Sequence, residues 1–106
     1  MSKYLVQFSY TTEGVKGLLK EGGSKRRQAT EQLFKSLGGR LEAYYFTYGE
    51  YDGFAIVDGL DDVDISAAAL TVSATGAVRV KTTVLLTPEQ VDQAAKKTAA
   101  YRPPGQ

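Results

Sequence analysis

The fold of this chain is decided by the stretch Arg-Leu-Glu-Ala-Tyr-Tyr-Phe-Thr-Tyr-Gly-Glu-Tyr-Asp-Gly-Phe-Ala-Ile-Val-Asp, residues 40–58. Its two halves, 40–48 and 52–58, are rich in aromatic and β-branched residues, which favour strands. The link at 49–51 is short enough to join these strands as a hairpin. The stretch therefore predicts two antiparallel strands in the middle of the chain.

The segment before the hairpin predicts one strand and two helices. Residues 4–10 alternate, with one apolar face, as expected for a strand. A threonine at 11 or 12 can cap a short helix, which the glycines at 22 and 23 interrupt. Ser24 is expected to cap the next helix, which ends at the Gly-Gly pair 38–39. Its apolar stripe consists of Ala29, Leu33 and Leu37, with Phe34 beside it.

The segment after the hairpin predicts helix, strand and helix. Asp61 can cap a helix that stops at Thr75-Gly76, and a fourth strand follows over 77–86. Thr87-Pro-Glu-Gln has the pattern of a capping box with proline at the first helical position, so a last helix is expected through about Tyr101. Residues 1–101 then form one domain, and 102–106 a flexible tail.

The order strand, helix, strand, strand, helix, strand is that of the ferredoxin-like βαββαβ fold, which belongs to the α+β class. Right-handed crossovers place both main helices on one face of a four-stranded antiparallel sheet, with the first and third strands in the middle. The helix-covered face is expected to hold Val6, Phe8, Val78 and Val80. By alternation, the opposite face is expected to hold Gln7, Ser9, Arg79, Lys81, Glu42, Tyr44, Phe46 and Tyr48.

That opposite face is half polar and half aromatic, which is typical of an interface. Two copies packed face to face would bury the aromatic residues and place Arg79 and Lys81 near Glu42 of either copy. The sequence therefore predicts a homodimer formed through the sheet.

The composition excludes several classes of function. The 106 residues carry a net charge of +1, so neither nucleic acid nor a membrane is an expected partner. The only basic cluster, residues 25–27, is interpreted as a solvated helical turn, with an anion site as the alternative. Histidine and cysteine are both absent, which removes the usual nucleophile systems and most zinc sites. No metal or other cofactor is predicted, and the polar N-terminal segment predicts a cytoplasmic protein.

The segment 45–58, Tyr-Phe-Thr-Tyr-Gly-Glu-Tyr-Asp-Gly-Phe-Ala-Ile-Val-Asp, resembles the signature of the GYD-domain family. The resemblance extends from Tyr4 to about Pro88. It implies a place among the dimeric α/β-barrel proteins, which are ferredoxin-like domains that pair through their sheets. It implies no reaction, because related barrels include cofactor-free monooxygenases, haem-associated enzymes and small cyclases or isomerases.

Five residues are the candidates for a site. Asp52 could act as a base, although aspartate beside glycine is also usual in a turn. Tyr10 and Tyr48 could orient or protonate a substrate, and Tyr44 could line an aromatic pocket, although strand aromatics often serve packing alone. Arg79 could bind an anionic ligand or pair with Glu42 or Glu50.

The preferred hypothesis is a homodimer that binds a small organic molecule in an aromatic pocket. One alternative is a cofactor-free oxygenase, isomerase or cyclase acting on an aromatic or polyketide-like substrate. Another is a structural subunit whose polar sheet face serves assembly only. An enclosed, partly polar cavity favours the first two, and a filled interior favours the third.

Overall fold

The computed structural model describes residues 2–106 and confirms the predicted α+β fold. Its four strands form one antiparallel sheet in the order β2-β3-β1-β4, so the first and third strands are central as expected. The elements are β1 (Ser2–Tyr10), α1 (Thr12–Glu21), α2 (Gly23–Ser36), β2 (Arg40–Phe46), β3 (Gly53–Leu60), α3 (Asp62–Ala74), β4 (Val78–Leu85) and α4 (Pro88–Ala95).

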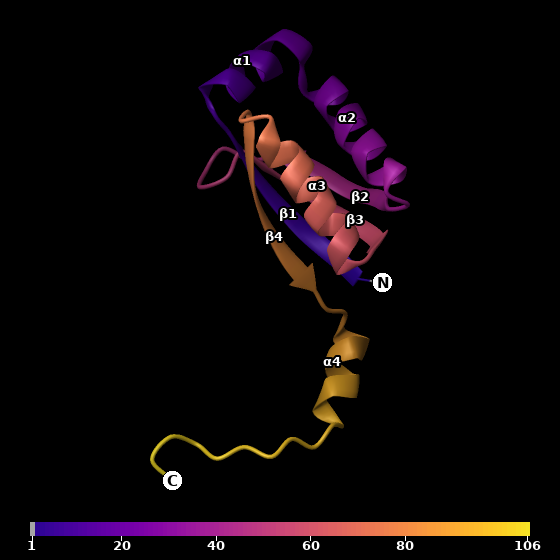
Figure 1. The fold of residues 1–106 in the computed structure, drawn as a ribbon, viewed down its shortest axis with the longest axis vertical. Coiled ribbons are helices and arrows are strands. Elements are labelled where there is room, and N and C mark those ends of the chain that lie inside the picture. The colour runs from indigo at the N-terminus through magenta and orange to yellow at the C-terminus, as the bar shows by residue number, and fades with distance from the viewer. Residues whose placement is uncertain (1) are drawn as a thin grey trace.

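Helices α2 and α3 cover the same face of the sheet, and the core lies between them and the strands (Figure 1). The central strand β1 contributes the side chains that alternation assigns to this face. Phe34 on α2 and Ile65 on α3 are buried in the core on the helix side. The core residues are Tyr4, Val6, Phe34, Ala55, Val57, Leu60, Ile65 and Ala68.

The predicted face of strand β2 was wrong for Tyr44 and Phe46, and the reason is a β-bulge. The register shifts between Leu41 and Ala43, so Glu42 is an extra residue opposite β3. Strict alternation fails across a bulge. Glu42 therefore lies on the sheet face away from α2 and α3, called the open face below, and pairs with Lys3 at 2.6 Å. Tyr44 and Phe46 turn toward the helices, where both rings contact Phe8.

Several predicted boundaries also change. Ser24 does not cap α2, because the helix already begins at Gly23 and its N-cap is Gly22. Gly22 has a φ of +88°, which favours glycine and lets two helices meet with one residue between them. The last helix ends at Ala95 rather than near Tyr101. It projects from the body, and the chain beyond it runs on without regular structure (Figure 1).

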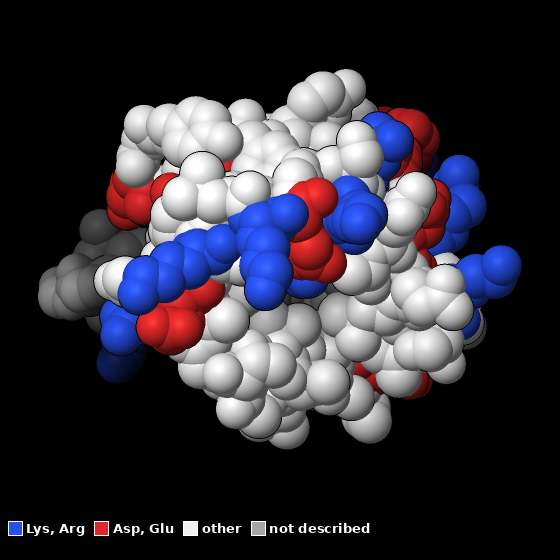
Figure 2. All heavy atoms as spheres, turned by 90° about the horizontal axis from the view of Figure 1, so that it is seen from above, with Lys and Arg blue, Asp and Glu red and all other residues white. Residues whose placement is uncertain are grey.

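Charged side chains are mixed rather than segregated. In the view of Figure 2, basic and acidic residues adjoin one another in small groups, and uncharged surface lies between these groups. This agrees with the small net charge of +1. Over residues 2–106, no helix combines the length and the apolar character that crossing a membrane requires.

Candidate functional site

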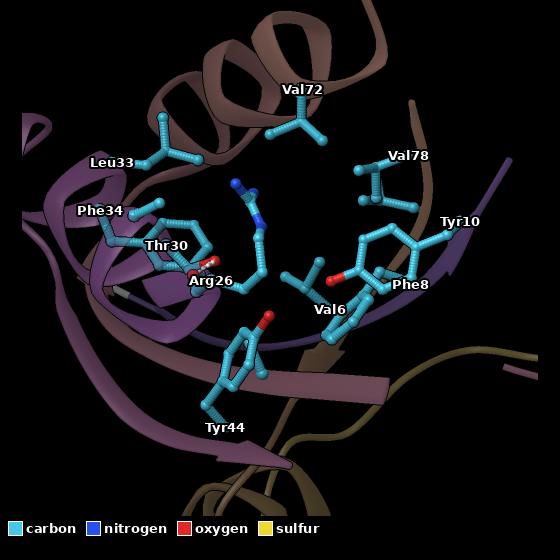
Figure 3. A pocket seen from close by; sticks show the side chains of 13 residues that line it. Val6, Phe8, Tyr10, Arg26, Thr30, Leu33, Phe34, Tyr44, Val72 and Val78 are labelled. Carbon is cyan, nitrogen blue, oxygen red and sulfur yellow. Dashed lines mark hydrogen bonds between the residues drawn. The ribbon is translucent and has the colours of Figure 1, made fainter. Parts of the chain in front are cut away.

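A pocket lies between the sheet and helices α2 and α3, and we call it the Arg26 pocket (Figure 3). Its volume is about 90 Å³, below the several hundred Å³ of typical drug-sized ligand sites. It therefore suits a molecule of a few heavy atoms or one end of a longer molecule. The lining residues are Val6, Phe8, Tyr10, Arg26, Ala29, Thr30, Leu33, Phe34, Tyr44, Ala55, Val72, Val78 and Val80.

Arg26 supplies the only charged side chain among these lining residues. Its guanidinium group points into the pocket, between the hydroxyl groups of Tyr10 and Tyr44 and the apolar side chains of Leu33 and Val72 (Figure 3). On the side of α1 it forms an ion pair with Glu21, with 3.4 Å between Nη1 and Oε2. Because the Arg26 side chain is about two-thirds buried, its charge acts in a less polar medium than water.

Tyr10 and Tyr44 reach the pocket from different strands, and Phe8 holds both rings in place. Phe8 stacks on Tyr44 with 5.4 Å between ring centroids and meets the edge of Tyr10 at 5.6 Å. Burial, followed by the neighbouring Tyr44 hydroxyl, raises the pKa of Tyr10, although Arg26 acts in the opposite direction. The Tyr10 phenol therefore stays protonated at neutral pH, where it can donate a hydrogen bond but cannot serve as a base.

The structure brings together only two of the five predicted site residues, Tyr10 and Tyr44. Asp52 does not line the Arg26 pocket, because its Oδ2 accepts a hydrogen bond of 2.8 Å from the backbone N–H of Tyr10. Its own N–H donates to the Phe8 carbonyl at 2.8 Å. These bonds fasten the β2–β3 loop to β1, which is a structural role. Tyr48 in the same loop is 81% exposed.

Arg79 lies on the opposite side of the sheet from the Arg26 pocket. It is exposed on β4 and opposite Ser9, so the sheet separates it from Tyr44. Arg79 is also far from Glu42 within the chain, because β2 and β4 are the two edges of the sheet. Tyr44 and Arg79 therefore cannot bind the same small ligand within one chain.

Sequence reasoning missed Arg26, and helical phase is the signal that would have found it. Arg26 precedes Ala29, Thr30 and Leu33 by three, four and seven residues, so it continues the apolar stripe of α2. Its neighbour Arg27 is off this stripe and exposed. A basic residue that lies in phase with an apolar stripe can reach the interior. The basic run 25–27, taken as a whole, instead has the pattern of a solvated helical turn.

The open face carries the second candidate surface. The strand registers place Leu5, Ile56 and Ala43 in one row across the sheet, and Phe54 beside Tyr45 in the next. Tyr45 is 62% exposed, and its ring lies 5.7 Å from that of Phe54. The ion pairs Lys3–Glu42 and Arg40–Asp58 border this apolar centre. An apolar centre with a charged rim has the composition of a protein interface.

Comparison with known proteins identifies one family. Residues 4–95 match the model of the GYD domain, a span that reaches from β1 to the end of α4. No curated protein and no solved structure matches the chain.

Proposed function

The chain belongs to the GYD domain family, and on that premise we propose that it is a homodimer that binds a small organic anion in the Arg26 pocket. The observation that carries this proposal is the convergence of one guanidinium group and two phenol hydroxyls inside an apolar pocket. Charge-assisted hydrogen bonds from such donors suit a carboxylate or a similar oxyanion. The apolar walls suit its carbon body.

The electrostatics of the pocket support an anion rather than a neutral ligand. A partly buried cation is stabilised by a negatively charged partner. Glu21 supplies such a partner on the α1 side of Arg26, and a bound anion would supply one on the pocket side. On the pocket side, the protonated Tyr10 and the Tyr44 hydroxyl can each donate to a bound oxygen. The lining residues include no carboxylate, which supports binding rather than proton abstraction from a substrate.

The homodimer is proposed from the open face. Its apolar centre of Leu5, Ala43, Tyr45, Phe54 and Ile56 faces away from both core helices. Packing two such faces together would remove this apolar surface from water and leave the charged rim solvated. This arrangement replaces the interface expected from the sequence, in which Tyr44 and Phe46 took part.

Titration with benzoate, followed by NMR chemical shifts or calorimetry, tests the proposed binding. Benzoate carries a carboxylate on an apolar ring, and benzyl alcohol is the neutral control. We expect saturable benzoate binding that is weakened at least about tenfold in Arg26→Gln, because a hydrogen bond to a charged group is lost. Arg27→Gln, on the same helix but outside the pocket, is the matched control and should bind as the unmodified protein does.

Two results would contradict the proposal. One is equal affinity for benzoate and benzyl alcohol, which would mean that the pocket does not recognise charge. The other is equal benzoate affinity in the two arginine variants. Melting temperatures of both variants must be compared first, because Arg26 also pairs with Glu21.

A further inference from the structure

We propose that the ligand is a carboxylate with an unbranched alkyl chain, whose head binds at Arg26 and whose chain extends beneath α3. This inference rests on the proposed function, and it narrows the ligand from an organic anion to a straight-chain carboxylate. Two further cavities that adjoin the Arg26 pocket carry the argument.

The first is a narrow space of about 20 Å³ under α3, called the inner chamber, which opens to solvent on the side of the exposed Thr82. It shares Val6, Leu33, Phe34, Val72 and Val80 with the Arg26 pocket, so the two spaces are adjacent. Its remaining lining residues are Ile65, Ala68, Ala69 and Thr82, none of them charged. Such a space is almost wholly apolar and therefore favours hydrocarbon over water.

The second is an outer chamber of about 230 Å³ between α1 and the end of the sheet. It shares Tyr10, Arg26, Val72 and Val78 with the Arg26 pocket. Glu21 and Thr75 are among its other lining residues, so this end is more polar than the inner chamber, although most of its lining is apolar. The lining of the three cavities thus becomes less polar from the outer chamber, past the Arg26 guanidinium, to the inner chamber.

This order of polarity fixes the orientation of the ligand. A carboxylate is held at Arg26 and the phenols, because a charge in the apolar inner chamber would lose its hydration without gaining a partner. We place the carbon body in the inner chamber because its lining has no charged residue, whereas the outer chamber is lined by the Glu21 carboxylate. A space of about 20 Å³ accommodates the end of a polymethylene chain more readily than a ring.

Binding of butanoate and hexanoate to the intact protein tests the inference. Each buried methylene contributes about 0.8 kcal/mol, a factor of about four, so two more methylenes should tighten binding about fifteenfold. Ala69 lines the inner chamber, and Ala69→Leu fills part of it. In that variant we expect hexanoate to lose most of this advantage while butanoate affinity changes less than about twofold. Ala74→Leu, at the exposed end of the same helix, is the matched control and should keep the advantage.

The results separate this inference from the proposed function. If butanoate and hexanoate bind equally well and both depend on Arg26, the anion site stands and the alkyl-chain inference fails. A hexanoate advantage that survives Ala69→Leu unchanged also overturns the inference, because the chain then lies elsewhere. Failure of both acids and of benzoate to bind overturns the proposed function as well.

Discussion

At the scale of single residues, Gly53 shows how closely the pocket wall is packed. It is buried at the start of β3, opposite Phe8 on β1. A β-carbon added there would lie 2.3 Å from Cζ of Phe8 and 2.7 Å from the Tyr45 carbonyl oxygen. Phe8 cannot easily yield, since its ring is stacked on Tyr44. The missing side chain of Gly53 thus makes room for the ring that positions Tyr10 and Tyr44.

Gly53→Ala should lower the free energy of unfolding by about 1–3 kcal/mol, the usual cost of an overpacked core. Urea denaturation measures this change. Gly49→Ala in the preceding loop is the control, since a β-carbon added at Gly49 would have no other atom within 4 Å and the φ of this glycine is not positive. The control should stay within about 0.5 kcal/mol of the unmodified protein. Equal stability of the two variants would mean that the Phe8 ring moves freely.

Tyr10 should ionise late in an alkaline titration, because burial and the Tyr44 hydroxyl raise its pKa. Tyr4 should also ionise late, since its hydrogen bond to Asp62 and its burial raise its pKa. A raised folded-state pKa stabilises the protein below the ordinary tyrosine pKa near 10, and this stabilisation is lost as the pH rises above that value. Tyrosinate absorbance should therefore show late-ionising groups that include Tyr4 and Tyr10. Tyr10→Phe should remove one of them, and an unchanged number of late groups would contradict the assignment.

At the scale of elements, the sequence predicted the type and order of every helix and strand in residues 2–106. Period-two alternation in β1, the glycines after α2 and the caps of α3 and α4 are all local signals, and all of them hold. The β-bulge at Glu42 is not local. The bulge depends on the pairing of β2 with β3, in which Leu41 and Tyr44 both face the helices although they are three residues apart. One extra residue moved Tyr44 from the predicted interface to the pocket.

The caps of α3 and α4 should have different consequences when they are removed. Both helices begin with a capping box, at Asp61 and Thr87. Helix α3 buries Ile65 and Ala68 in the core, whereas α4 buries no residue. Asp61→Ala should therefore lower the melting temperature of the whole domain. Thr87→Ala should cost about 1 kcal/mol in α4 alone, visible as lost helical signal without a change in melting temperature.

The loss of melting temperature caused by Asp61→Ala should also depend on pH. The hydrogen bond from the Asp64 backbone N–H lowers the pKa of Asp61 below its ordinary value of 3.8. A lowered folded-state pKa stabilises the protein above the ordinary value, and this stabilisation disappears as the pH falls through the folded-state pKa. The difference in melting temperature between Asp61→Ala and the unmodified protein should shrink in acid. A constant difference would show that the carboxylate charge plays no part in the cap.

At the scale of the whole molecule, two features leave apolar surface unpaired within the chain. Helix α4 and the chain after it project from the body of the molecule, which measures 57 Å along its longest axis, and Val91 on α4 is exposed. The open face presents Leu5, Phe54 and Ile56 without a covering helix. The open face spans a four-stranded antiparallel sheet, and a second layer packed on it would bury its apolar side chains. It is therefore the surface on which the homodimer proposal depends.

Ile56→Asp should convert the proposed dimer to a monomer. Ile56 lies on central strand β3 between Leu5 and Ala43, so the carboxylate would be buried without a partner in the dimer, whereas in the free chain this position is half-buried and still in contact with water. Light scattering coupled to size-exclusion chromatography measures the mass. Leu70→Asp makes the same kind of change at a side chain of α3 that is 72% exposed, and this control should leave the mass unchanged. If Leu70→Asp dissociates the protein and Ile56→Asp does not, the copies pair through their helices, and the open face is free for another partner.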